Sequence, residues 1–175
     1  MLRYFRFRSA GIPLATLLTL ASPAFAAAPE SLGAFKDWGA FSFDENGQKV
    51  CYMAAQPKKS EGNYSSRGEI HLLITHRPAE KSYDVVSVIT GYTYQENSEA
   101  TVQIGNQSFR LFTNGETAWA RDEKTDKSLV DAIRKARMLV IKGTSSRGTV
   151  TTDTYSLDGS SAAYDAINQA CGVKR

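Results

Sequence analysis

The tetrapeptide Ser-Ser-Arg-Gly occurs at residues 65–68 and again at 145–148, each time just before a run of β-prone residues. Such a segment could form a phosphate cradle, carry an activated serine or make a turn. The stretch 143–148 fits the first half of a Walker-type phosphate loop, but Thr149 stands where the phosphate-binding lysine should follow. The residues after it alternate like a strand, whereas a phosphate loop opens a helix. The sequence therefore excludes a Walker-type loop.

A serine nucleophile is not indicated either, because the chain has no G-x-S-x-G elbow. A turn accounts for the serines and glycines, which supply local hydrogen bonds and positive φ, but it does not account for the arginines. We predict that Arg67 and Arg147 form a forked-donor patch for a carboxylate or phosphate on a partner. The alternative is that each arginine braces its own turn against an Asp or Glu. The candidate binding residues are Arg67, Arg147, Ser66, Ser146, Lys58, Lys59, Tyr92 and Tyr94.

The chain has two cysteines, Cys51 and Cys171, and two histidines, His71 and His76. In an exported chain the two cysteines are expected to close into a disulfide that brackets nearly the whole fold. The histidines lie five residues apart on a predicted strand, so they point to opposite faces of the sheet. A metal site needs more ligands than these, and we predict none.

The elements that must position these residues are mostly strands, because the dominant hydrophobic period is two. Turn signals at 44–47 and 105–106 predict hairpins. If consecutive strands alternate in direction, the loops at 55–68, 92–99, 113–115 and 144–148 share one end of the fold, and both SSRG copies lie there. The polar stretch 57–68 is long enough to be a mobile loop. The predicted strands are 38–43, 48–54, 69–77, 83–91, 100–104, 107–112, 116–120, 138–143 and 149–157.

Two helices are predicted among the strands. The first covers residues 126–136, with Asp126 or Ser128 as its cap and one apolar face. The second covers residues 160–171 and stops at Gly172, a favoured helix end. The predicted disulfide would therefore tie the C-terminal helix to the sheet.

The first 26 residues have the pattern of a secretory signal peptide. Arg3, Arg6 and Arg8 precede an apolar stretch that ends in the cleavage pattern Ala24-Phe25-Ala26. A membrane anchor is the alternative, but the apolar stretch is shorter than the roughly 20 residues that a spanning helix needs. Cleavage leaves a single domain, residues 27–175, with 18 basic and 18 acidic side chains. This balance gives no support to a nucleic-acid partner.

Several segments resemble the invasion-associated locus B family of exported Gram-negative proteins. They are "GTSSRGTVTTDTYSL" and "AAYDAINQAC", with "CYMAAQPKK", "LLITHRP", "VQIGNQSFRLF" and "AWA" earlier in the chain. The resemblance implies an immunoglobulin-like β-sandwich in the periplasm or at the cell surface, and in pathogenic members a link to the invasion of host cells, notably erythrocytes. It brings no catalytic residues. Trp38 precedes both cysteines, so the Cys-Trp-Cys order of true immunoglobulin domains is absent.

Together these features predict a mainly β protein, an immunoglobulin-like antiparallel β-sandwich with two short helices. We expect no enzymatic activity, no cofactor and no transmembrane segment in the mature chain. The expected role is binding to a protein or cell-surface partner, in host-cell invasion or in the bacterial envelope. The alternative is a periplasmic binder of a small anionic ligand, or an envelope processing factor. An exposed apolar patch would favour the first role, and a pocket with convergent donors the second.

Overall fold

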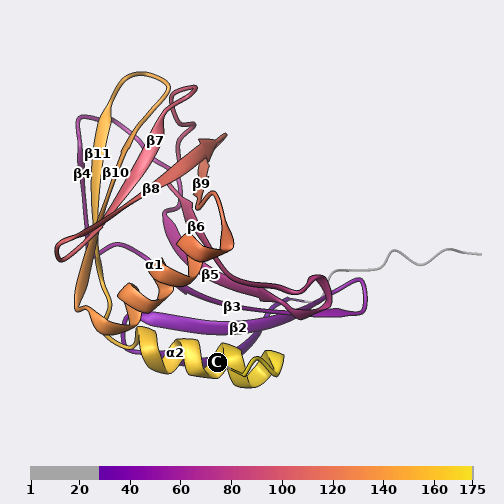
Figure 1. Cartoon of the computed structure of the whole chain (residues 1–175). Coiled ribbons are helices and arrows are strands. Elements are labelled where there is room, and N and C mark those ends of the chain that lie inside the picture. Colours follow the sequence, from indigo (N-terminus) through magenta and orange to yellow (C-terminus); the bar gives the residue numbers. More distant parts are fainter. Residues whose placement is uncertain (1–27, 175) are drawn as a thin grey trace, which may run out of the picture.

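The computed structural model describes residues 28–174, and the signal peptide predicted for residues 1–26 lies outside them. Strands dominate this part of the chain, and two helices accompany them (Figure 1). No helix in residues 28–174 is long and apolar enough to cross a membrane. The strands are β1 (Glu30–Phe35), β2 (Trp38–Glu45), β3 (Gln48–Ala55), β4 (Lys59–Gly62), β5 (His71–Arg77), β6 (Ser82–Ile89), β7 (Glu99–Ile104), β8 (Gln107–Asn114), β9 (Thr117–Trp119), β10 (Met138–Thr144) and β11 (Val150–Ser156). The helices are α1 (Glu123–Lys135) and α2 (Ser160–Cys171), with a short 3-10 turn at Pro78–Glu80.

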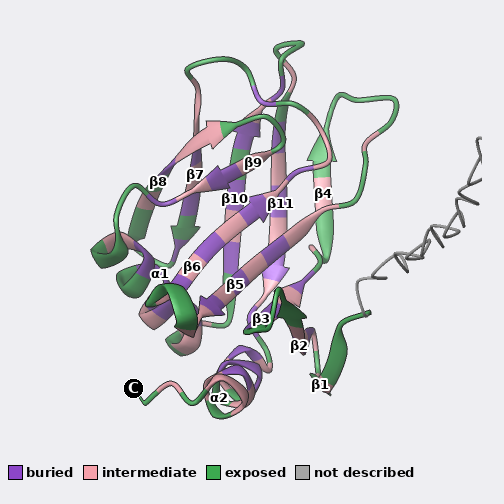
Figure 2. Cartoon of the chain, turned by 90° about the vertical axis from the view of Figure 1, so that its right-hand side faces the viewer, coloured by how far each residue is buried: buried purple, intermediate pink, exposed green. Residues whose placement is uncertain are grey.

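The strands form one antiparallel sheet in the order β1-β2-β3-β5-β6-β9-β8-β7-β10-β11-β4. The sheet is strongly bent, so that β5 and β6 lie in front of β10 and β11 when the molecule is seen from its right-hand side (Figure 2). The two halves of the sheet enclose one hydrophobic core, to which the apolar face of each helix contributes. The predicted β-sandwich is confirmed, with its layers joined as parts of a single sheet.

The predicted strands are all present, with ends that differ by one or two residues. The predicted hairpin at 44–47 is a tight turn in which Asn46 and Gly47 have positive φ and the Gly47 N–H donates to Asp44 Oδ1 at 2.6 Å. Two strands were not predicted, β1 and β4, and they form the two edges of the sheet. β4 occupies part of the stretch expected to be a mobile loop and pairs with β11.

Both helices are where the apolar pattern predicts them, but the N-cap of α1 is different. The carboxylate of Asp122 accepts a hydrogen bond from the N–H of Thr125 at 2.8 Å, so Asp122 is the cap rather than Asp126 or Ser128. Asp126 is instead buried, and its carboxylate accepts the N–H of Val86 on β6 at 2.9 Å. α2 ends at Gly172 with φ of 64°, as predicted.

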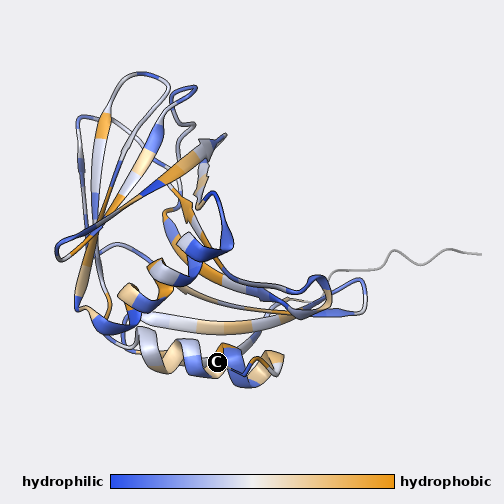
Figure 3. Cartoon of the chain, in the orientation of Figure 1, coloured by the Kyte–Doolittle hydropathy of each residue, from blue (hydrophilic) through white to orange (hydrophobic). Residues whose placement is uncertain are grey.

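The two faces of the β2-β3-β5 region differ. One face carries Ala40, Met53 and Cys51, which belong to the core beneath α2. The other face carries Phe41, Tyr52 and Leu73, which are half-buried. Among residues 28–174, those that line the hollow on this second face belong to strands and loops and not to either helix. Figure 3 shows apolar segments along the strands of the sheet as a whole.

Candidate functional site

The two SSRG copies lie side by side at one end of the bent sheet. The backbone of the second copy bonds to the β6–β7 connection, because the Ser146 N–H donates to the Thr93 carbonyl at 2.8 Å and Tyr94 pairs with Ser145. The shared end predicted from strand alternation is therefore confirmed. Together these segments surround a cavity of about 390 Å³, here called the SSRG pocket. Its lining consists of Asn63, Tyr64, Ser65, Ser66, Arg67, Gly91, Tyr92, Thr93, Ser145, Ser146, Arg147, Thr149 and Thr151.

The structure contradicts the prediction that Arg67 is a free forked donor. Its two terminal nitrogens donate to the two carboxylate oxygens of Asp153 at 2.7 and 2.6 Å, and its Nε donates to the Thr90 carbonyl at 2.6 Å. The side chains of Arg67 and Asp153 are 4% and 2% exposed. Burial disfavours the charge of Arg67, but the hydrogen bonds and the charge of Asp153 outweigh it and raise the pKa of the guanidinium. Arg67 is thus a brace between the first SSRG segment and β11.

Two tyrosine rings lie within cation–π distance of the Arg67 guanidinium. The guanidinium carbon of Arg67 lies 4.9 Å from the centre of the Tyr92 ring and 5.7 Å from that of Tyr64. The Tyr92 hydroxyl is 2.7 Å from Thr151 Oγ1, and burial raises the pKa of this phenol. Tyr94 and Tyr155 lie deeper, and burial raises the pKa of both phenols strongly. These hydroxyls therefore stay neutral at physiological pH.

Close backbone contact holds the pocket wall in place. The Gly68 N–H donates to the Gly91 carbonyl at 2.9 Å, and a Cβ on Gly91 would lie 2.5 Å from the Gly68 carbonyl carbon. Gly91 also has φ of 68°, a conformation that side-chain-bearing residues adopt at a cost. The first SSRG segment is thereby fixed against the β6–β7 connection.

The other predicted binding residues divide into three groups. Ser66, Ser146 and Arg147 are exposed and line the SSRG pocket, as does half-buried Tyr92. Tyr94 is buried beneath the pocket. The prediction that the two lysines join this cluster is wrong, because they lie toward the other end of β11. Lys58 forms an ion pair with Asp37, and Lys59 with Glu61 at 2.8 Å.

A second hollow, of about 650 Å³, lies on the uncovered face of the sheet and is here called the open-face groove. Its floor is apolar, and the Phe41 and Tyr52 rings stack there with their centres 5.1 Å apart. Charged and polar residues surround this floor, among them Lys58, Asp37 and His71. The lining is Lys36, Asp37, Gly39, Phe41, Tyr52, Ala54, Ala55, Gln56, Pro57, Lys58, His71, Leu73 and Ile89.

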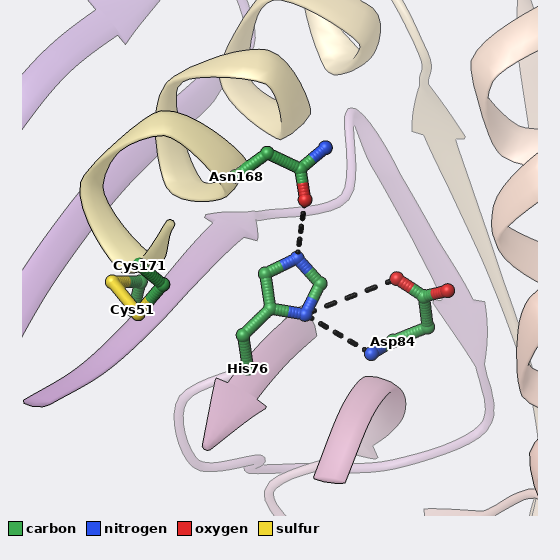
Figure 4. Close-up of a disulfide and its surroundings, with 5 residues drawn as sticks. All are labelled: Cys51, His76, Asp84, Asn168 and Cys171. Carbon is green, nitrogen blue, oxygen red and sulfur yellow. Dashed lines mark hydrogen bonds and ion pairs between the residues drawn. A yellow bond between two sulfur atoms is a disulfide. The ribbon is translucent and has the colours of Figure 1, made fainter. Parts of the chain in front are cut away.

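The predicted disulfide between Cys51 on β3 and Cys171 at the end of α2 is confirmed. Figure 4 shows it beside a buried polar network. His76 Nε2 lies 2.9 Å from Asn168 Oδ1 of α2, and His76 Nδ1 accepts the N–H of Asp84 at 3.1 Å. The imidazole is fully buried, so it cannot meet a substrate. The network secures α2 to the sheet.

Sequence reasoning missed three acidic residues that organise the interior, namely Asp84, Asp126 and Asp153. The signal was available for Asp153, because it alternates in phase with the inward-facing Thr151 and Tyr155 of β11. An acid in such a position must be paired in order to be buried. In the described part of the chain no group of three or more His, Cys, Asp and Glu residues could hold a metal ion.

A solved structure and a family model match this chain. The chain resembles the solved "Crystal structure of invasion associated protein b from bartonella henselae", with a TM-score of 0.56 and 17% sequence identity. The likeness covers 82% of this chain and 97% of that one, and at this identity it concerns the fold. No curated protein matches the sequence. The family model described as "Invasion associated locus B (IalB) protein" matches residues 38–168. The chain therefore belongs to the invasion associated locus B (IalB) family.

Proposed function

We propose that this protein is exported, has no catalytic activity and acts by binding a protein partner in the periplasm or at the cell surface. The observation that carries this proposal is the open-face groove, where the stacked Phe41 and Tyr52 rings and Leu73 remain half-exposed. Aromatic side chains that keep exposed area are typical of contact surfaces between proteins. The partner would present apolar side chains to this floor.

The setting of this binding is host-cell invasion or a function of the bacterial envelope. The name of the Bartonella henselae protein connects that protein with invasion, and a role in the envelope requires no host. Both settings need the chain to leave the cytoplasm, as the pattern of residues 1–26 predicts. The groove can serve either setting, because its apolar floor selects a partner only by the side chains that the partner presents.

Photo-crosslinking in intact cells tests this role. A photoreactive phenylalanine analogue at position 52 lies in the groove, and the same analogue at exposed Lys135, at the end of α1, is the matched control. We expect a discrete protein adduct from position 52 alone, and we expect it to weaken when Leu73→Asp places a charge on the groove floor. Equal adducts from both positions, or an adduct that Leu73→Asp leaves unchanged, would count against the groove as the contact site.

The absence of catalysis is tested separately. Purified protein should show no turnover above blank on ester, peptide and phosphate substrates. Reproducible turnover that is lost on Ser146→Ala would overturn this part of the proposal.

A second candidate function is the binding of a small anionic ligand. The observation that favours it is the SSRG pocket, whose lining by described residues contains two arginines and no carboxylate. This site is separate from the open-face groove, so the two functions do not exclude one another.

A further inference from the structure

The SSRG pocket carries an unbalanced positive charge. Arg67 and Arg147 both line it, and among residues 28–174 the only carboxylate paired with either of them is Asp153, which is 2% exposed and neutralises Arg67. Arg147 is exposed, and it makes no hydrogen bond or ion pair with any other residue between 28 and 174. One guanidinium therefore faces the pocket with no counter-charge from the described chain.

Hydroxyl groups from both SSRG segments line the same pocket as this charge. Ser65 and Ser66 approach from the first SSRG segment and Ser146 from the second, and all three are exposed. None of these hydroxyls bonds to another described residue, whereas the Ser145 hydroxyl already accepts the Thr149 N–H at 3.2 Å. Each free hydroxyl can donate one hydrogen bond, and the guanidinium can donate two in parallel. The available donors thus belong to two separate loops.

This arrangement suits a tetrahedral oxyanion better than a planar carboxylate. A carboxylate offers two oxygens in one plane, while phosphate or sulfate offers oxygens in several directions and so can accept donors from both loops. The volume of about 390 Å³ falls in the range of small-molecule sites, so it leaves room for the body of a ligand. The Tyr64 ring, which is 37% exposed, offers that body an aromatic wall.

We infer that the SSRG pocket binds a phosphate or sulfate group, with Arg147 as its charged anchor and Ser65, Ser66 and Ser146 as its hydroxyl donors. This inference rests on the second function proposed above. It differs from a Walker-type loop, because side chains rather than a helix N-terminus supply the donors. The Arg67–Asp153 pair fixes the wall of the site.

Amide NMR titration of the folded protein tests the inference. Inorganic phosphate, sulfate and acetate are added in turn at constant ionic strength, with chloride as the reference. We expect saturable shifts at residues 65–68 and 145–149 with phosphate or sulfate, and weaker binding of acetate. Arg147→Gln should weaken phosphate binding by about tenfold or more. Arg137→Gln is the matched control, since Arg137 is exposed at the opposite end of β10 and should leave the affinity unchanged.

The outcomes separate the inference from the function on which it rests. If none of the three anions gives saturable shifts, both fail. If acetate binds as tightly as phosphate, anion binding stands and the tetrahedral preference fails. An unchanged affinity in Arg147→Gln overturns Arg147 as the anchor. Glycerol phosphate and phosphatidylglycerol vesicles then distinguish the source, because binding of either that depends on Arg147 identifies the phosphate as that of a soluble ligand or of a lipid.

Discussion

Removing the positive charge of Arg67 should destabilise the fold far more than its place in a loop suggests. In Arg67→Met the Asp153 carboxylate would remain 2% exposed without its partner, and three hydrogen bonds would be lost. Breaking one side of a buried ion pair costs about 3–5 kcal/mol, a large part of the roughly 5–15 kcal/mol that stabilises a typical domain. The double variant Arg67→Met/Asp153→Leu should recover most of this loss, since it leaves no unpaired charge.

Urea unfolding followed by tryptophan fluorescence measures these free energies, because Trp38 is 1% exposed and reports loss of the core. The matched control is Lys36→Met, which breaks the Lys36–Asp158 pair, whose side chains are 70% and 57% exposed. We expect this control to change stability little, because surface ion pairs contribute little. The reasoning would be refuted if Arg67→Met cost no more than Lys36→Met, or if the double variant were as unstable as the sum of the two single variants.

Three further outcomes follow from the interior and the backbone. Burial raises the pKa of Asp126 to about 6, so its stabilising contribution is complete below the unfolded pKa near 4 and is lost as the pH rises through 6. Asp126→Asn should remove this pH dependence and raise the free energy of unfolding in urea by up to about 3 kcal/mol at pH 7.5. Parallel profiles of stability against pH for the two proteins would contradict this. Gly91→Ala should lower the melting temperature clearly more than Gly105→Ala. Both glycines have positive φ, but of the two only Gly91 would bring a Cβ against backbone, at 2.5 Å. Equal decreases in melting temperature would mean that the contact at Gly91 relaxes freely. Replacing both Cys51 and Cys171 by serine should lower the free energy of unfolding by up to about 5 kcal/mol, because the disulfide closes a loop with a sequence separation of 120. Equal denaturant midpoints for the oxidised wild type and this variant would contradict the prediction.

The elements predicted best are those whose secondary structure follows from the pattern of their own residues. The alternating strands and the apolar faces of both helices could be read directly, as could the glycine stop of α2. The edge strands could not. β4 has the sequence Lys-Ser-Glu-Gly, with no alternation of apolar residues, and it is a strand because β11 offers it a hydrogen-bonding partner. β1 is interrupted by an irregularity between Ser31 and Gly33.

The candidate site was predictable in its position but not in its internal pairing. Strand alternation was enough to bring the two SSRG segments together. The partner of Arg67 depended on the contact between Gly68 and Gly91, which places the guanidinium over Asp153, 86 residues away in sequence. Local sequence patterns do not predict the contact between Gly68 and Gly91. An acid on the inward face of β11, however, does indicate that a positively charged side chain must pair with it.

The disulfide also constrains the order in which the molecule can be completed. Synthesis runs from the N-terminus, so Cys51 is made 120 residues before Cys171, and its thiol has no partner within the chain while β5 to β11 are still being added. Since the sequence contains two cysteines, no wrong intramolecular pairing can form during this interval. A premature oxidation can only join Cys51 to another molecule. The intramolecular disulfide can therefore form only after the chain has been synthesised through α2, so its presence indicates that the chain extends through that helix.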